Sequence, residues 1–572
     1  MPTLNSNKKI QSGYYWLLPL FLLVIAQAVF IYLYLILPQG PFCWDEAHRS
    51  VFSLMVAKSL ISGNFSMLWQ LTNQQIYWPF LHSWASSIFL IIGGFSYPAA
   101  RTMSLTMNAG ALITIYFIAR KVTDRGGGVV GLIAAGLFAL SPIFTFFAAT
   151  AMAESLGIFL SLLVLLSYLT AWQKSSWRWY LLSGVFLALL YFTKYIYAIF
   201  FGFGIFLFWL SFLFNNRERV KLQTNLRQFW IMPVAFGVCL FLWMLGGHAG
   251  DKIGILAYRF RDTGGWDYLK LGLMKRILFY PSAIFWVYTF SPWIFLSYIC
   301  GLIWGFCNWR NLKVRLLLIL FLSNLMPMSL SVNLQERFIA TSIPCLFILT
   351  ALFLTSLWNM GKRKWYWMVP LIWLILISGD LHKLPEYIRI IGNTTLGIMN
   401  YKSPKIRTCS TLFGIIDYPK FIIRQKNILL PQNQEQIPRH DLEDIYEFIW
   451  ENTDPRGGIC ALFQLNEASP HLWRWHSLAR NQPIFNNWNP NCYFFVSLSL
   501  SPLSNYRTMV NLNLLRGKGR TEDGHRFLEG LTQKGLLNVL KKRSYADMGM
   551  VITIYTRAIP VNDYRWRKIL FN

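Results

Sequence analysis

The stretch Pro41–Arg49, with the sequence PFCWDEAHR, follows an apolar run that extends from about Tyr14 to Leu37. This run is long enough to cross a bilayer as a helix, because a membrane span needs about 20 apolar residues. The adjacent carboxylates Asp45 and Glu46 therefore lie at or near a membrane surface. Ionisable groups are costly in that setting and are usually retained for function. The stretch predicts a membrane protein with a reactive site at the end of its first span.

A second interpretation of the same stretch is the start of a helix. Asp45 would then be the N-cap, Glu46 would lie in the first turn, and Gly63 would be the first residue after the helix. The two interpretations are compatible, since the first turn of a helix can also carry a catalytic group. A helix start accounts for one carboxylate better than for two, so we expect a catalytic role for at least Asp45.

The composition predicts a polytopic membrane protein. The chain has 572 residues, of which 55% are hydrophobic, 17% aromatic and 14% charged. A soluble domain carries about 25% charged residues. The net charge of +28 would suggest nucleic acid binding in a soluble protein. Basic residues are expected here in cytoplasmic loops and at anionic lipid surfaces, and no nucleic-acid motif accompanies them, so no nucleic-acid partner is predicted.

Cysteine spacing does not indicate a cofactor. The eight cysteines form no CxxC pair and no Cys/His metal spacing. Four of them fall in segments that we place outside the membrane, which leaves a disulfide open without indicating one; they are Cys43, Cys409, Cys460 and Cys492.

Apolar runs alternate with basic loops, and this alternation predicts the topology. Lys8 and Lys9 precede the first run, which places the N-terminus in the cytoplasm. Ala85–Gly94 is too short to span, so we expect a juxtamembrane helix against the outer face, within an outer loop of residues 41–97. About 11 spans are predicted in residues 1–379: Tyr14–Leu37, Pro98–Ala119, Val129–Thr150, Leu156–Trp172, Tyr180–Phe192, Ile196–Phe214, Phe229–Gly247, Ser282–Phe306, Leu316–Leu330, Phe338–Leu357 and Trp365–Ile377.

The alternation also predicts which charged residues share a side of the membrane. Each turn from one span to the next reverses the direction of the chain. Residues far apart in the sequence are thereby brought to one outer face, namely Asp45, Glu46, Glu154, Lys194, Glu336 and Arg337.

The character of the chain changes at about Asp380. Apolar runs become shorter, and the content of charge, proline and asparagine rises. Asp441–Trp450 has the pattern of an amphipathic helix, and Ile459–Phe463 and Val551–Tyr555 have that of short strands. The predicted fold class is thus an α-helical polytopic membrane protein followed, over residues 380–572, by a small extracytoplasmic α/β domain.

Four stretches occur in a fixed order along the predicted spans: WDEAHR after the first span, SPIFTFFAATAMAESLGIFL with Glu154, GVFLALLYFTKYIYAIF with Thr193 and Lys194, and QERFIATSIP with Glu336 and Arg337. In these residues the chain resembles the GT-C membrane glycosyltransferases that use polyprenyl-phosphate sugars. The resemblance is to the bacterial branch of the dolichyl-phosphate-mannose protein mannosyltransferase family, which includes the aminoarabinose transferases acting on lipid A.

The resemblance covers roughly Trp16 to Ile377 and departs from the aminoarabinose transferases at one place. A Lys-Pro-Pro triplet is expected there, and this chain instead has IYWPFLH, Ile76–His82, with Trp78 and Pro79 and no lysine. One phosphate contact and the identity of the donor sugar therefore stay open.

The resemblance implies an inverting transfer of a sugar from a polyprenyl-phosphate donor to a lipid, glycan or protein of the cell envelope. It implies a multi-pass protein of the plasma (inner) membrane that acts on the outer face. Such a reaction needs a carboxylate to take the proton of the acceptor hydroxyl, for which Asp45 is suited. Glu46 or Glu154 would orient the acceptor or bind a divalent metal ion, and the metal requirement stays open.

Cations are needed where the departing lipid phosphate gains charge. Lys194, Arg337 and Arg49 suit this task, as a point charge or as bidentate forks. The further candidates for substrate contact are Tyr77, His82 and Glu336.

Structural explanations compete with several of these assignments. Lys194 at a span end can simply extend to the interface. Glu336 and Arg337 can form a local ion pair. His48 and His82 are expected to be interfacial or hydrogen-bonded rather than metal ligands.

Two other classes of protein are alternatives. A transporter or flippase of lipid-linked sugars would show internal repeats and ionisable groups at mid-membrane, and neither is found in the sequence. An oligosaccharide polymerase or ligase uses similar lipid-linked donors, and the sequence does not separate it from a single-sugar transferase.

Overall fold

The computed structural model describes a helical region and part of a C-terminal sheet. The predicted span Trp365–Ile377, apart from Ile375, and the predicted helix Asp441–Trp450 lie outside the described residues, as does the side chain of Asp45. The described residues are 15–37, 42, 44–123, 127–213, 228–261, 273–289, 291–331, 334–361, 375, 378–380, 459–461, 475, 479, 508–514, 530, 532–533, 535, 537–545 and 550–557.

Most of the described residues up to 361 are helical. The elements are α2 (Leu17–Ile31), the π-helix η1 (Tyr32–Ile36), α3 (Trp44–Ile61), α4 (Phe65–Gln74), α5 (Leu81–Gly93), α6 (Tyr97–Val122), α7 (Gly127–Ala139), α8 (Pro142–Ala148), α9 (Glu154–Lys174), α10 (Trp177–Thr193), α11 (Tyr195–Leu213), α13 (Ile231–Met244), α14 (Ala249–Arg261), α15 (Leu273–Val287), α16 (Pro292–Cys307), α17 (Leu312–Ser329), the 3₁₀ helix η3 (Glu336–Ile339) and α18 (Ile343–Gly361).

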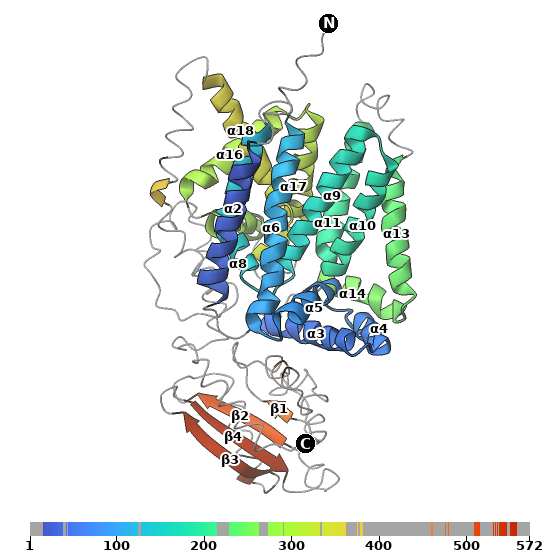
Figure 1. The fold of residues 1–572 in the computed structure, drawn as a ribbon, viewed down its shortest axis with the longest axis vertical. Helices are drawn as coiled ribbons and strands as arrows, with labels where there is room; N and C mark the ends of the chain where they lie inside the picture. The colour runs from blue at the N-terminus through green and yellow to red at the C-terminus, as the bar shows by residue number, and fades with distance from the viewer. Residues whose placement is uncertain are drawn as a thin grey trace.

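Most of the helices that form the bundle run side by side, and three others lie across one end of it. In Figure 1, α2, α6, α9, α10, α11, α13 and α17 are roughly parallel, and α3, α4 and α5 cross beneath them. Helix α5 contains the predicted juxtamembrane segment Ala85–Gly94 except its last residue. Helix α3 ends at Ile61, two residues before Gly63, whose φ of 66° is the left-handed conformation expected after a helix.

Length and composition support membrane crossing for several helices. Five described stretches are long and apolar enough to span a bilayer, and they match predicted spans: Leu17–Ile36, Tyr97–Val122, Glu154–Lys174, Tyr195–Phe212 and Leu312–Ser329. Other described helices are apolar but shorter, among them α13, α16 and most of α18. The polytopic helical fold is therefore confirmed, and the number of about 11 spans stays a prediction.

Two predicted spans are not single straight helices. The span predicted at Val129–Thr150 consists of α7 and α8, which are bent by 72° at a break. Pro142, at the start of α8, lacks an amide hydrogen, and the hydroxyl of Ser141 donates to the carbonyl of Tyr288 at 3.1 Å. The prediction of one span over Ser282–Phe306 is wrong. Helix α15 ends at Val287, and a separate helix, α16, begins at Pro292.

The two ends of the bundle differ in charge. Helix α9 has 21 residues, about 30 Å at 1.5 Å per residue, and it runs from Glu154 to Lys174. Lys121, at the end of α6, lies near Lys174 and near Lys313, at the start of α17. The ammonium of Lys313 donates to the carbonyl of Lys121 at 3.1 Å, which caps α6. One end of the bundle is thus basic, and the other holds buried carboxylates.

The C-terminal residues include a four-stranded sheet with the order β1-β2-β4-β3. Strand β1 pairs parallel with β2, and the other pairs are antiparallel. Strands β1 and β4 fall at the two predicted strand positions, and the division at Asp380 stays a prediction. The strands are β1 (Ile459–Ala461), β2 (Thr508–Leu514), β3 (Leu537–Tyr545) and β4 (Met550–Arg557).

One described residue from the C-terminal part packs against the start of the helical region. The ring of Trp475 is buried and lies 4.9 Å from the ring of Phe42, between η1 and α3. It also stacks on Tyr97 at 6.3 Å, in the first turn of α6. In Figure 1 the sheet lies on the same side of the bundle as α3, α4 and α5.

Candidate active site

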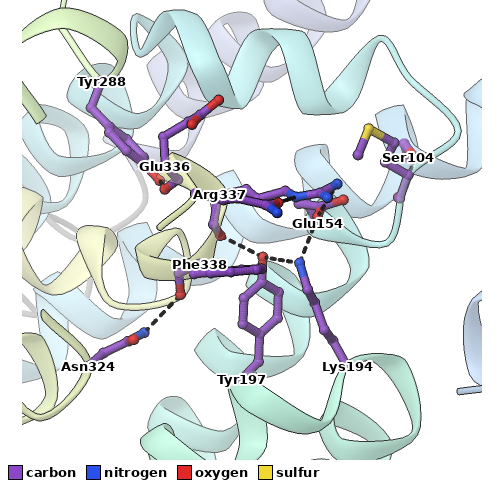
Figure 2. A network of polar contacts seen from close by, with 11 residues as sticks. Ser104, Glu154, Lys194, Tyr197, Tyr288, Asn324, Glu336, Arg337 and Phe338 are labelled. Carbon is purple, nitrogen blue, oxygen red and sulfur yellow. Dashed lines mark hydrogen bonds and ion pairs between the residues drawn. The ribbon is translucent and has the colours of Figure 1, made fainter. Parts of the chain in front are cut away.

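The candidate site is centred on Glu154, the first residue of α9. Its side chain is fully buried, and its Oε1 accepts a hydrogen bond from Nζ of Lys194 at 2.9 Å. Nη1 of Arg337 lies 3.7 Å from the same oxygen. Lys194 is the residue between α10 and α11, and Arg337 belongs to η3, so separate helix ends converge on one carboxylate (Figure 2). The structure brings together three residues that the sequence predicted to share one face.

The second oxygen of Glu154 is not used in the same way. Its Oε2 is buried and has no hydrogen-bond partner among the residues that the structure describes. Buried polar atoms are nearly always hydrogen-bonded, so an exception points to a water, an ion or a ligand that completes the site. The charge of Arg49 also acts on Glu154, which adds a third cation to the surroundings of this carboxylate.

Segment η3, which carries Arg337, is held in place by side chains from three other segments. The hydroxyl of Tyr288 donates to the carbonyl of Glu336 at 2.8 Å, and that of Tyr197 donates to the carbonyl of Arg337 at 2.7 Å. The amide of Asn324 donates to the next carbonyl, that of Phe338, at 3.4 Å. Successive peptide groups are therefore fixed from outside, as expected for a helical segment of only four residues.

The side chains of Glu336 and Arg337 diverge. Figure 2 shows the guanidinium of Arg337 extending toward Glu154, while the carboxylate of Glu336 points away from it. Arg337 also donates from Nε to Oε1 of Gln335 at 2.6 Å. The guanidinium of Arg337 thus pairs across the site with Glu154. This pairing argues against a local ion pair between Glu336 and Arg337.

Arg49 lies on α3, one turn after Asp45, and is buried. Its guanidinium stacks over the ring of Trp78 at 4.4 Å, within the segment between α4 and α5. That segment is tied to α11 through the hydroxyl of Tyr195, which donates to the carbonyl of Ile76 at 2.6 Å. The ring of Tyr77 meets that of Trp78 in an edge contact. Because the side chain of Tyr77 is 39% exposed, it is accessible to a bound molecule.

His82 is a buried neutral group beside these cations. It lies in α5, close to the backbone of Met152 and to the charges of Arg49 and Glu154. Burial, reinforced by the positive charge of Arg49, lowers the pKa of His82 to about 3. The imidazole is therefore uncharged at neutral pH.

Glu46 is engaged in a separate buried network. Its Oε1 accepts from Nε of Arg101 at 3.1 Å and from the backbone amide of Ala151 at 2.7 Å. Its Oε2 accepts from Nη2 of Arg101 at 3.2 Å. Next to it, the hydroxyl of Ser104 donates to the carbonyl of Met152 at 3.3 Å. Side chains of α3 and α6 thus hold the backbone just before Glu154.

Comparisons with known proteins show what the chain is similar to in sequence and in fold. Residues 78–244 match the family model of the dolichyl-phosphate-mannose-protein mannosyltransferases. The structure of ArnT from Cupriavidus metallidurans bound to undecaprenyl phosphate is similar, with a TM-score of 0.52, 12% identity, and coverage of 95% of this chain and 98% of that chain. The apo structure of the same protein has a TM-score of 0.53 and 12% identity, over 93% of this chain and 97% of that chain. No curated protein matches the chain in sequence.

Part of the membrane region is thus similar in sequence to that mannosyltransferase family, and the chain shares the fold of ArnT. The predicted resemblance is confirmed. The family match includes Trp78, His82, Glu154 and Lys194 and ends before Arg337, which the fold brings to the same place.

Some residues of the candidate site were not among the sequence candidates. Arg101 stands inside the predicted span Pro98–Ala119, and an ionisable residue in a span is itself a signal of function. Tyr197, Tyr288 and Asn324 had no such signal, because tyrosine and asparagine are ordinary residues at span ends.

Two of the candidate assignments are not settled by these contacts. Asp45 lies in the first turn of α3, and its side chain is outside the described residues. No three His, Cys, Asp or Glu side chains gather as metal ligands within the part of the chain that the structure describes.

Proposed function

We propose that the protein transfers a sugar from a polyprenyl-phosphate donor to a lipid, glycan or protein of the cell envelope, with inversion at the anomeric carbon. The observation that carries the proposal is the convergence of Lys194 and Arg337 on Glu154 at one end of the helical bundle. The similar ArnT structure holds undecaprenyl phosphate, which supports a lipid-phosphate donor for this chain as well.

In the proposed reaction, the acceptor hydroxyl attacks the anomeric carbon from the side opposite the phosphate. The new bond joins the acceptor oxygen to the sugar, and the bond between the sugar and the phosphate oxygen breaks. We assign Asp45 as the base that takes the proton of the hydroxyl. The lipid leaves as a polyprenyl phosphate, with both electrons of the broken bond on the phosphate.

We assign three cationic side chains to the binding of the donor phosphate. Lys194, Arg337 and Arg49 all act on the charge of Glu154, which places three positive charges around one buried carboxylate. A donor phosphate near this carboxylate would share these cations. The phosphate gains negative charge as it leaves, so the cations stabilise the transition state more than the bound donor.

The carboxylates have different proposed tasks. Glu154 holds Lys194 and Arg337 at one point, and its Oε2 remains for a hydroxyl of the acceptor or the sugar. Glu46 is proposed as a positioning residue, because Arg101 and the Ala151 amide engage both of its oxygens. Tyr77, His82 and Glu336 remain candidates for substrate contact.

The orientation in the membrane is part of the proposal. We infer that the end of the bundle with Glu154 faces the outside of the plasma membrane, and that the N-terminus is cytoplasmic. The lysines at the opposite end, Lys121, Lys174 and Lys313, fit the excess of basic residues in cytoplasmic loops. Residues 380–572 would then form an extracytoplasmic domain.

The experiment that tests the function is mass spectrometry of envelope glycolipids and glycoproteins from cells with and without the protein. An envelope lipid, glycan or protein that carries an additional sugar only in cells that make the protein is the acceptor. The purified protein in nanodiscs should then transfer that sugar from its polyprenyl-phosphate donor and release polyprenyl phosphate. Unchanged envelope components, together with no transfer from any lipid-phosphate sugar, would refute the proposal.

A further inference from the structure

The hydroxyl of Tyr197 contacts the two cation-bearing segments at once. It accepts a hydrogen bond from Nζ of Lys194 at 3.2 Å and donates one to the carbonyl oxygen of Arg337 at 2.7 Å. Figure 2 shows the hydroxyl between the ammonium of Lys194 and the backbone of η3. One hydroxyl group therefore links a residue at the start of α11 to one that lies 140 positions later in the chain.

The ring of Tyr197 is fixed as firmly as its hydroxyl. The side chain is fully buried, and its ring packs directly on Gly157 in α9. A Cβ at Gly157 would lie 2.7 Å from the ring, so only glycine permits this approach. The ammonium of Lys194 lies 4.5 Å from the centre of the same ring. Tyr197 thus contacts Lys194 through both its ring and its hydroxyl.

The second hydrogen bond is one of three that fix the backbone around Arg337. Segment η3 has four residues, and its carbonyls are held by Tyr288, Tyr197 and Asn324 in succession. Of these three side chains, only that of Tyr197 is also hydrogen-bonded to a side chain that contacts Glu154. It is therefore a hydrogen-bonded link through which a shift of η3 would reach Lys194, beside the ring of Phe338, whose centre lies 5.0 Å from the same ammonium.

We propose that Tyr197 is a positioning residue that couples Lys194 to Arg337, so that both cations meet the donor phosphate as one unit. The inference rests on the proposed function. A displacement of about 1 Å in a catalytic site can cost about 10²-fold in rate, so a link that fixes the distance between two cations has a large effect on turnover. The coupling should act mainly on the transition state, where the phosphate carries its additional charge.

The test is a comparison of Tyr197→Phe, Arg337→Met and the double variant with the wild type. Tyr197→Phe keeps the ring on Gly157 and removes both hydrogen bonds. We expect turnover at saturating donor to fall about tenfold or more, the loss typical of a hydrogen bond to a charged group, with little change in KM for the donor. In the double variant, turnover should be no lower than in Arg337→Met alone, because the two residues act through one arrangement.

Two other tyrosines provide matched controls. Tyr298→Phe removes a buried hydroxyl on α16 that has no hydrogen-bond partner among the described residues, and turnover should be unchanged. Tyr288→Phe removes the bond to the neighbouring carbonyl of η3. Tyr288 has no hydrogen bond to Lys194 in the described part of the chain, so the effect of this change should be smaller than that of Tyr197→Phe. Normal turnover in Tyr197→Phe, or multiplicative losses in the double variant, would overturn the inference.

A second measurement separates this inference from the proposed function. If the wild type transfers no lipid-linked sugar, the proposed function fails, and the coupling is then measured from the unfolding of the same four proteins in detergent. Non-additive changes in the free energy of unfolding would support a direct link between Tyr197 and Arg337. Additive changes would refute it whatever reaction the protein catalyses.

Discussion

The two buried carboxylates Glu46 and Glu154 differ in how their oxygens are used. Both oxygens of Glu46 accept hydrogen bonds, from Arg101 and from the backbone amide of Ala151. Glu154 uses Oε1 for Lys194, while its Oε2 has no partner among the described residues. A completed network needs nothing from a substrate, whereas an incomplete one leaves a position for it.

The energetics explain why this difference is informative. A buried ion pair is tolerated when further hydrogen bonds satisfy the remaining polar atoms, as they do around Glu46. A buried acceptor without a partner costs about 1–3 kcal/mol. Such a cost at Glu154, among three cations, is typical of a binding site rather than of a structural pair.

The largest expected effect comes from the neighbour of Glu46. Asp45→Asn keeps the size and hydrogen bonding of the side chain and removes its negative charge. We expect turnover to fall about 10²–10⁴-fold, the usual contribution of a general base, with normal amounts of folded protein. The measurement is the initial rate of sugar transfer per folded molecule. Near-normal turnover in Asp45→Asn, together with a loss of turnover in Glu46→Gln, would identify Glu46 as the general base instead.

Changes to the completed network should act on stability. Glu46→Gln and Arg101→Met each leave one buried partner of the pair, and each should lower the free energy of unfolding by about 3–5 kcal/mol. The double variant should lose less than the sum, because neither charge is then left alone. Denaturant unfolding in detergent measures these values. A Glu46→Gln protein as stable as the wild type and inactive would assign Glu46 to the substrate instead.

Changes to the incomplete network should act on turnover. Lys194→Met and Arg337→Met should each lower the rate at saturating donor by about 10²-fold, and should weaken donor affinity by less. Arg337→Lys should restore activity only in part, since a point charge cannot replace a bidentate fork. Kinetics with a polyprenyl-phosphate sugar measure both quantities.

Lys121→Met is the matched control for these two substitutions, because Lys121 lies at the opposite end of α6 from Arg101. Its turnover should be normal. If the Lys194→Met and Arg337→Met proteins accumulate poorly but have normal turnover per folded molecule, the contacts of these two residues with Glu154 are structural. Glu154 would then have the same structural role as Glu46.

Much of this fold was predictable from apolar length and loop charge alone. The runs that became α2, α6, α9, α11 and α17 are long and continuous, so their helical state depends little on tertiary contacts. The alternation of direction was also sufficient to bring Glu154, Lys194 and Arg337 to one place, since each stands at a predicted span end.

The features that could not be predicted depend on how a helix is rotated about its own axis and on contacts between residues far apart in the sequence. The rotation of α3 about its axis decides that Glu46 faces Arg101, and a pair of adjacent carboxylates carries no information about that rotation. The bend between α7 and α8 has one sequence signal, Pro142, but the bond from Ser141 to the carbonyl of Tyr288 joins residues 147 positions apart. Interactions at such separations have no local pattern.

The smallest expected effect concerns His82, which is buried between Arg49 and Glu154. Burial and Arg49 lower its pKa to about 3 in the folded protein, against an ordinary value of 6.5, while the charge of Glu154 acts in the opposite direction. Between these two values the unfolded chain binds a proton at this residue and the folded chain does not. Protonation therefore favours the unfolded state, and stability falls as the pH falls below about 6.5.

The size of the effect is about 1.4 kcal/mol per pH unit, or about 2 kcal/mol at pH 5. His82→Gln removes the titrating group and keeps a neutral polar side chain, so its stability should fall less than that of the wild type between pH 7 and pH 5. Above pH 7 the imidazole is neutral in both states, and the difference between the two proteins should be constant there. Denaturant unfolding at several pH values measures this difference. Parallel curves for the two proteins from pH 7 to pH 5 would mean that His82 is protonated in the folded protein as readily as in the unfolded chain. A partner such as Glu154 would then have to stabilise its charge, and the site would hold one more cation than we infer.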